Sequence, residues 1–160
     1  MVEETLLVKT EDIVRIARSW KGTPYHHQAS LKGVGVDCVG LIRGVYRELY
    51  GVEPPELINY STDWGDSNGN EDMVLAAYKY LEPVPLDQLG AGHVILVRWK
   101  EKRVAKHSMI MTGDNRAIHA YNRSPVTEIN LNDWWMQKIV YAFAFPLGGE
   151  VTWLGFYSLA

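Results

Sequence analysis

The chain has 160 residues, a formal net charge of −3 at pH 7 and one cysteine, and 47% of its residues are hydrophobic while 22% are charged. These values are typical of a globular protein, and we expect residues 1–160 to form a single domain with a sizeable core. The mild acidity argues against nucleic acid as the main partner, because a basic footprint is missing. One cysteine cannot form an internal disulfide, so the fold does not depend on an oxidising compartment.

The N-terminal residues 1–5 are acidic and lack the basic region and the apolar run of a signal peptide. No apolar run in the chain reaches the ~20 residues that a membrane span requires. We therefore expect a protein without a membrane span, synthesised in the cytoplasm without a signal peptide.

Helical spacing of apolar residues predicts three helices in the first half of the chain. In the first helix, Thr10 is expected to be the N-cap, and acidic residues fill the first turn, where they suit the helix dipole. Asn70 is expected to cap the third helix. The expected helices cover residues 10–21, 39–50 and 70–81, and the loops between them cover residues 25–37 and 52–69.

The second helix contains two glycines, Gly40 and Gly44, which cost about 1 kcal/mol each relative to alanine. They are four residues apart and therefore share one face of the helix. A closely packed neighbour, such as a strand that carries a catalytic base, explains their presence.

After Gly92 the apolar pattern changes from a helical period to extended, β-branched runs. Glu101-Lys102 and Gly113-Asp114-Asn115 supply turns between the first three runs, which predicts a meander of antiparallel strands. A short helical turn is expected at residues 132–135. Helices followed by a run of strands indicate the α+β class. The expected runs are residues 93–99, 104–112, 117–121, 126–129, 139–145 and 153–157, the last being either a strand or a packed tail.

Cys38 is expected in the first turn of the second helix, directly after a glycine-containing loop. Unpaired backbone N–H groups and the positive end of the helix dipole favour an anion at this place. A thiolate is such an anion, so we expect the pKa of the thiol to fall below its free value of about 8.5. A cysteine in this setting is a candidate nucleophile, provided that a base lies nearby.

The chain offers five histidines as candidate bases. A short turn between the expected strands brings His107 and His119 within hydrogen-bond reach, where one imidazole takes the thiol proton and the other orients it. From spacing alone the two could equally be satisfied core histidines, because many hairpins carry two histidines by chance. His26 and His27 are expected at the loop surface or the rim of a groove, and His93 opens the first strand.

Four short motifs occur in a fixed order along the chain: Gly22-Thr23-Pro24-Tyr25, Asp37-Cys38-Val39-Gly40-Leu41, His107-Ser108-Met109-Ile110 and Ile118-His119-Ala120. In order, spacing and expected helix or strand context, this set resembles the NlpC-type cell-wall cysteine peptidases. The resemblance covers nearly the whole chain. The longer run over residues 20–51 is most similar to the phage and gene-transfer-agent branch of that family.

The resemblance implies a papain-like α+β fold, in which N-terminal helices pack on a central antiparallel sheet and the nucleophile lies at a helix N-terminus. Position by position, it makes Cys38 the nucleophile, His107 the general base and His119 the orienting third member. It also implies substrate-binding roles for Tyr25, beside the thiol, and for Asp37, which could serve as the helix N-cap as well. No metal or organic cofactor is required.

Members of the family typically cut the γ-D-glutamyl to diamino-acid bond in peptidoglycan stem peptides, and the resemblance implies this activity here. Two positions depart from the family pattern. Val39 stands where serine is common, so a hydroxyl that would contact the substrate is missing and the exact stem specificity stays open. Gly92-His93 stands where Gly-Asp is common, at a position that is usually structural.

Three other readings use the same residues. A related amidase would cut between muramic acid and L-alanine, and some papain-like relatives are acyltransferases. Cys38, His107 and His119 also supply three ligands of a zinc-type site. A non-catalytic wall-binding or tail-structural module is the last alternative, although such a module has no use for an activated thiol.

The context of action follows from the expected absence of an export signal. A wall hydrolase without one must travel with something else, and the branch resemblance favours a phage tail or gene-transfer particle. We therefore expect action at the bacterial cell wall, with peptidoglycan stem peptides as substrate and particle proteins as partners.

Overall fold

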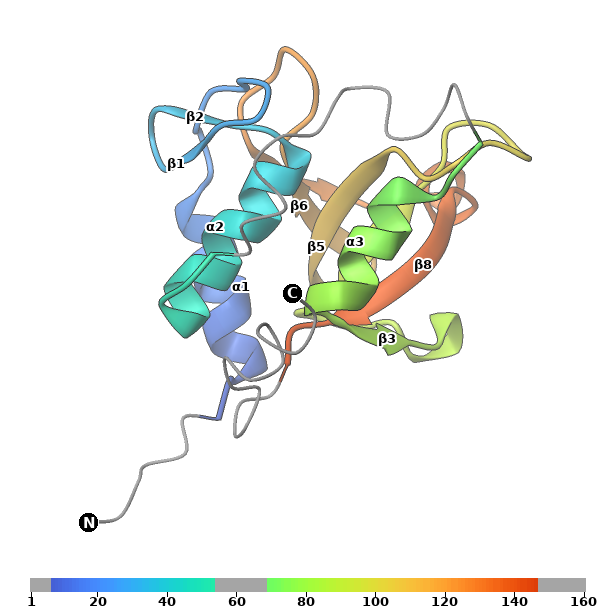
Figure 1. The fold of residues 1–160 in the computed structure, drawn as a ribbon, viewed down its shortest axis with the longest axis horizontal. Helices are drawn as coiled ribbons and strands as arrows, with labels where there is room; N and C mark the ends of the chain where they lie inside the picture. Colours follow the sequence, from blue (N-terminus) through green and yellow to red (C-terminus); the bar gives the residue numbers. More distant parts are fainter. Residues whose placement is uncertain (1–6, 54–68, 147–160) are drawn as a thin grey trace.

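The computed structural model describes residues 7–53 and 69–146 (Figure 1). In these residues an antiparallel sheet with the strand order β3-β8-β4-β5-β6-β7 carries α1, α2 and α3 on one face, which is an α+β fold. The elements are α1 (Thr10–Ser19), β1 (Ser30–Leu31), β2 (Gly35–Val36), α2 (Cys38–Tyr50), α3 (Asp72–Tyr80), β3 (Glu82–Val84), the 3-10 helix η2 (Leu86–Gln88), β4 (Val94–Val97), β5 (His107–Gly113), β6 (Arg116–His119), β7 (Thr127–Asn130), α4 (Asp133–Met136) and β8 (Ile139–Ala144).

Helix α1 is amphipathic, as the spacing predicts, and its apolar stripe ends in the fully buried ring of Trp20. The expected cap is wrong by one residue. Lys9 is the N-cap and makes no side-chain capping bond; instead its carbonyl accepts hydrogen bonds from the amides of Asp12 and Ile13. Thr10 is therefore the first residue inside the helix.

Helix α2 begins at Cys38 and ends at Tyr50, and the C-cap residue Gly51 has a φ of 76°, the left-handed conformation that glycine adopts without strain. Its two internal glycines are explained by close neighbours, but these are not the strand that was expected. A Cβ on Gly40 would lie 1.9 Å from the carbonyl oxygen of Ala29, and a Cβ on Gly44 would lie 2.1 Å from the Trp20 ring. The glycines thus fit α2 against the preceding loop and against the end of α1.

The loop before α2 contains a small hairpin, β1 and β2, that the sequence did not predict. Tyr25 forms an isolated parallel bridge with Val36, and the amide of Val36 donates to the carbonyl of Pro24 over 2.9 Å. These bonds hold Tyr25 next to the residues that lead into α2.

Helix α3 starts at Asp72 with Glu71 as its N-cap, so the capping role expected for Asn70 is wrong. The expected loop at residues 52–69 lies mostly outside the described residues, and the run at residues 153–157 lies wholly outside them.

The second half of the chain forms the predicted meander, in which β4, β5, β6 and β7 pair in succession. Strand β8 then returns to pair with β4, and the short β3 pairs with the outer edge of β8. Pro83 lies inside β3, which an edge strand tolerates because one of its sides needs no partner amides. This topology brings the start of β5 and the end of β6 together.

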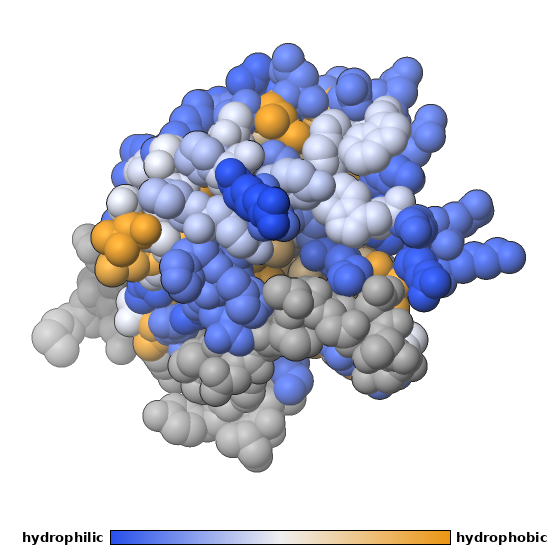
Figure 2. Space-filling model, turned by 90° about the horizontal axis from the view of Figure 1, so that it is seen from above, coloured by the Kyte–Doolittle hydropathy of each residue, from blue (hydrophilic) through white to orange (hydrophobic). Residues whose placement is uncertain are grey.

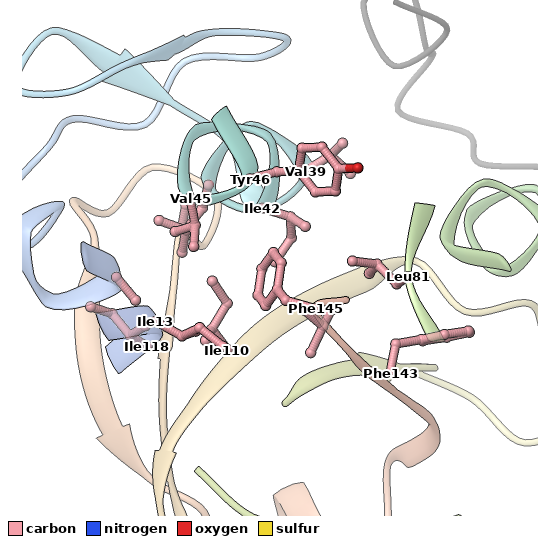
Figure 3. Packing of buried hydrophobic residues seen from close by; sticks show 14 of the residues in the cluster. Ile13, Val39, Ile42, Val45, Tyr46, Leu81, Ile110, Ile118, Phe143 and Phe145 are labelled. Carbon is pink, nitrogen blue, oxygen red and sulfur yellow. The ribbon is translucent and has the colours of Figure 1, made fainter. Parts of the chain in front are cut away.

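Apolar residues pack on both faces of the sheet. On the helical face Ile13, Val45 and Ile110 meet between α1, α2 and β5 (Figure 3). On the other face Met109 and Met111 of β5 pack with residues near α4. The core therefore anchors α2 directly against the strand that begins with His107.

The outer surface of the described residues is mainly hydrophilic when the molecule is viewed from above, with small, separate hydrophobic areas (Figure 2). Two of the exposed apolar side chains are Leu31 and Val34 in the β1–β2 hairpin. No helix in the described part of the chain has the length and hydropathy needed to cross a bilayer.

Candidate active site

Cys38 is the first residue of α2 and is partly exposed. The helix starts here because Asp37 caps it: one carboxylate oxygen accepts from the amide of Gly40 over 2.7 Å, and the other accepts from the amide of Gln28 over 2.7 Å. Asp37 is only 2% exposed. The expected position of the cysteine at a helix N-terminus is confirmed.

Ser108 connects this helix end to β5. Its hydroxyl donates to the carbonyl oxygen of Cys38 over 3.1 Å. The amide and hydroxyl of Ser108 and the amide of Val39 also lie close enough to the sulfur of Cys38 to favour its thiolate. The sulfur therefore lies beside the residue that follows His107. Ser108 belongs to one of the four sequence motifs, but nothing in the sequence assigned it this contact.

The expectation of a lowered thiol pKa is wrong for the resting protein. Burial raises the pKa of Cys38 to about 11, and the charge of Asp37 adds to the increase. The hydrogen bonds from Ser108 and Val39 act in the opposite direction but do not outweigh these two effects. Cys38 is consequently a neutral thiol at pH 7.

His107 and His119 form a direct pair. His107 Nε2 and His119 Nδ1 are 2.9 Å apart, and both residues are buried, with exposed fractions of 4% and 6%. Burial lowers the pKa of His107 to about 3, with a further contribution from the charge of His119, and burial lowers the pKa of His119 to about 4. Both rings are neutral at pH 7, so one of the two nitrogens donates the proton of this bond.

No hydrogen bond joins Cys38 to His107 in the described structure, and the two residues are placed by Ser108 and by the packing of α2 on β5. Tyr25 is close enough to Cys38 and Asp37 for their charges to act on it. Burial chiefly, and then these two charges, raise the pKa of Tyr25 to about 12. Its hydroxyl therefore keeps its proton and can donate a hydrogen bond.

Of the two loop histidines, His27 lies near Asp37 and His26 contacts His27. His27 Nδ1 is 3.6 Å from Asp37 Oδ2, and its side chain is 38% exposed. His26 Nδ1 is 3.1 Å from the carbonyl oxygen of His27. The position of both at the rim of the site agrees with the sequence expectation.

Aromatic rings surround the histidine pair. Trp99 stacks on His107 with a centroid distance of 5.4 Å and an interplanar angle of 22°, and Tyr121 stacks on His119 at 5.7 Å and 13°. Trp135 presents an edge contact to His119 at 5.6 Å. This arrangement could not be predicted from the sequence, because the three aromatic residues come from separate segments.

The zinc-type alternative requires three converging ligands. Within the described residues, no group of three or more histidine, cysteine, aspartate or glutamate side chains is arranged to hold a metal ion. The described site contains a thiol at the start of α2 and a hydrogen-bonded imidazole pair on β5 and β6.

The profile of the NlpC/P60 family matches residues 22–144, which include Tyr25, Cys38 and both histidines of the pair. The chain belongs to the NlpC/P60 family. The match begins at the first of the four sequence motifs and ends with β8, so it spans the helix, the sheet and the site together.

The chain is similar to three proteins that carry NlpC/P60 domains or murein hydrolase names. The murein DD-endopeptidase MepS/murein LD-carboxypeptidase of Escherichia coli K12 is 27% identical over 119 residues, which are 74% of this chain and 53% of that protein. The chain therefore spans about half the length of this relative.

The other two proteins are solved structures. The NlpC/p60 domain of the peptidoglycan hydrolase SagA has a TM-score of 0.59 at 22% identity, covering 86% of this chain and 100% of that one. RipD of Mycobacterium tuberculosis, a non-catalytic NlpC/p60 domain protein adapted to peptidoglycan binding, has a TM-score of 0.51 at 16% identity, covering 84% and 95%. These two likenesses establish the fold.

Proposed function

We propose that this protein is a cysteine endopeptidase that hydrolyses peptidoglycan stem peptides. One observation carries the proposal: the only cysteine lies at the start of α2, in contact with Ser108, and the preceding residue, His107, shares a 2.9 Å hydrogen bond with His119. A nucleophile, a base and a group that orients the base are the parts that thiol-based acyl transfer needs.

The first half of the reaction forms a thioester. Because the resting thiol and the imidazoles are neutral, the proton leaves Cys38 Sγ for His107 as sulfur attacks the scissile carbonyl carbon. His119 accepts a hydrogen bond from the imidazolium of His107 and so stabilises it. The amide of Cys38 and the hydroxyl of Tyr25 donate to the oxyanion.

The second half of the reaction regenerates the thiol. The imidazolium of His107 gives its proton to the leaving amine as the peptide bond breaks. Water then attacks the thioester with His107 as the base, and the proton taken from the water returns to sulfur as the acid product leaves. Apart from the substrate and this water, the groups named in these steps are residues of the chain.

The bond that we propose is the γ-D-glutamyl to diamino-acid bond, which rests on the motifs around Cys38 and His107. The name of the relative MepS makes a DD-endopeptidase specificity the second candidate. An amidase or acyltransferase acting through the same thiol is a further alternative. A role for Asp37 in binding the substrate stays a prediction, and its bonds to Gly40 and Gln28 support the capping role first.

Digestion of purified peptidoglycan tests the proposal. The wild-type protein is expected to release new amino and carboxyl ends, and mass spectrometry of the fragments identifies which bond was cut. Cys38→Ala and His107→Ala are expected to abolish release while the fold is retained. His93→Ala is a matched control, since His93 makes its 3.1 Å bond to the amide of Gly90, outside the site. Full activity in either site variant would refute the assignment.

The non-catalytic alternative is supported by RipD, whose described function is peptidoglycan binding without catalysis. It differs from the proposal in one measurable respect. A binding module would sediment with peptidoglycan equally well as wild type and as Cys38→Ala, and neither protein would release new ends.

We further propose that the protein acts at the bacterial cell wall as part of a phage tail or gene-transfer particle. The support is the similarity of residues 20–51 to that branch of the family. Purified particles are expected to contain the protein, as detected by mass spectrometry. Its recovery only from the free cytosolic fraction would contradict the proposal.

A further inference from the structure

The aromatic rings around the histidine pair come from three places in the chain. Trp99 follows β4, Tyr121 follows β6, and Trp135 lies in α4. Together they form what we call the aromatic enclosure. Trp99 and Tyr121 present ring faces to His107 and His119, with interplanar angles of 22° and 13°. Trp135 approaches His119 almost perpendicularly, at 85°.

The aromatic enclosure can stabilise a positive charge that the histidine pair cannot neutralise by itself. The third member is a neutral imidazole, so the positive charge that forms on His107 during the reaction finds no carboxylate in that position. Among the described residues, the titratable or charged groups with a contact to the enclosure or to the ring of His107 are His119, Tyr121 and Lys138. The ammonium of Lys138 donates to the carbonyl of Trp99 over 3.0 Å and lies over the ring of Trp134. None of them is an acid that carries negative charge next to the ring of His107 before the thiol loses its proton.

An indole face is the strongest aromatic partner for a cation and acts within about 6 Å of the ring centroid. The Trp99 and His107 centroids are 5.4 Å apart and their planes are nearly parallel, an offset stack in which an imidazolium would lie against the indole π system. Trp134, which is half exposed, stacks on Trp99 at a centroid distance of 6.5 Å and meets Trp135 edge-on.

We propose that Trp99 is a positioning residue whose indole face holds the ring of His107 in line with His119 and stabilises the imidazolium formed when His107 takes the thiol proton. In that step the S–H bond of Cys38 breaks, its electron pair stays on sulfur, and the proton binds to His107. The proposal rests on the proposed function for its consequence in catalysis, but the proton transfer itself can be measured without peptidoglycan.

Alkylation of Cys38 by iodoacetamide measures this transfer directly, because no other cysteine is present in the chain. Trp99→Phe keeps an aromatic face, whereas Trp99→Leu keeps only an apolar side chain. At pH 7 we expect Trp99→Phe to react within about threefold of wild type and Trp99→Leu to react about tenfold more slowly. Tyr78→Leu, the same kind of change at an exposed aromatic residue of α3 that contacts Phe143 and not the enclosure, is the matched control and should leave the rate unchanged. Alkylation in urea should be equal for all proteins, which verifies that the thiol is intact.

Fluorinated tryptophan at position 99 distinguishes an effect of the electron density on the indole face from an effect of the ring's size. Mono- and trifluorinated rings keep the size of the indole and withdraw electron density from its face, so the alkylation rate should fall stepwise. On a stem-peptide substrate, kcat should fall in parallel while KM stays within about twofold.

Equal alkylation rates for Trp99→Phe and Trp99→Leu, or an alkylation rate that does not respond to fluorination, would overturn the proposal. If peptidoglycan is not cleaved by wild type but the alkylation series behaves as expected, only the proposed function fails.

Discussion

Asp37 has two effects on its neighbour that oppose each other. As N-cap it creates the helix end at which Cys38 lies, and as a carboxylate it raises the pKa of the thiol. Removing the charge while keeping an oxygen acceptor separates these effects. The variant Asp37→Asn is expected to lower the pKa of Cys38, so the pH midpoint of its alkylation rate should move to a lower value.

Asp114→Asn is the control for this titration, because Asp114 lies in the turn between β5 and β6 and should leave the midpoint unchanged. Asp37→Asn should also lose one backbone hydrogen bond, at a cost of about 1 kcal/mol in the free energy of unfolding. A thiol midpoint that stays constant or rises would show that the carboxylate does not act on the sulfur.

The position of Cys38 at a helix end and the pairing of His107 with His119 were predictable, but the electrostatics of the resting site was not. The helix N-terminus argument for Cys38 treats the thiol as if it faced water, whereas burial is the larger effect here. His107 and His119 were predictable because a short turn makes neighbours of β5 and β6. The stack of Trp99 on His107 was not, because it depends on how the segment after β4 folds back, and no local pattern encodes that.

At the scale of elements, the packing of α2 against its preceding loop depends on Gly40 having no Cβ. Helix propensity favours alanine over glycine by about 1 kcal/mol inside a helix. At Gly40 the added Cβ would lie 1.9 Å from the carbonyl oxygen of Ala29, a backbone atom that cannot move freely. Gly40→Ala is therefore expected to lower the free energy of unfolding by about 1–3 kcal/mol, because the clash outweighs the propensity gain.

Gly113→Ala provides the comparison for this substitution. No atom lies within 4 Å of the Cβ that it would add, so its unfolding midpoint in urea should stay close to that of wild type. If Gly40→Ala is as stable as Gly113→Ala, the close approach of α2 to Ala29 does not constrain the fold.

The amphipathic helices could be placed from the sequence because their burial pattern repeats over several turns, and the long strands because they are continuous apolar or β-branched runs bounded by turn residues. The two-residue strands β1 and β2 could not, since two residues carry no period. Strand β3 was missed because Pro83 argues against a strand, and only its place at the sheet edge makes proline acceptable there.

At the scale of the whole molecule, one buried carboxylate connects α1 to the far strands of the sheet. The side chain of Glu128 on β7 is 4% exposed and binds Arg18 over 3.0 Å and Lys21 over 2.6 Å, both near the end of α1. Arg116 and Thr112 also donate to it. These bonds, led by that from Arg18, hold the pKa of Glu128 well below its usual value.

Glu128→Gln is expected to reduce the free energy of unfolding by about 2 kcal/mol, because charged hydrogen bonds to a nearly buried acceptor are lost. Glu48→Gln is a control at a more exposed pair with Lys32, whose loss should cost less than about 1 kcal/mol. Urea unfolding of both variants measures the difference. If Glu128→Gln loses no more free energy of unfolding than Glu48→Gln, the bonds of Glu128 contribute no more to stability than an exposed ion pair does.

The histidine pair makes the stability of the whole fold depend on pH. In the unfolded chain these imidazoles titrate near 6.5, whereas burial lowers the pKa values to about 3 and about 4 in the folded state. The unfolded state therefore binds more protons than the folded state between those values. Stability is fully present above pH 6.5 and is lost as pH falls toward about 4, by up to about 1.4 kcal/mol per pH unit for each histidine.

Urea unfolding at a series of pH values between 7 and 4 checks this expectation, with His119→Gln as the comparison. Glutamine fills the same region without taking up a proton, so the variant should lose up to about 1.4 kcal/mol per pH unit of the wild-type slope. His26→Gln is the control, because it changes a loop histidine that lies outside the buried pair, and it should retain the wild-type slope. If the free energy of unfolding has the same slope against pH in wild type and His119→Gln, the pair is already protonated in the folded protein. The conclusion that burial keeps both imidazoles neutral at pH 7 would then be wrong.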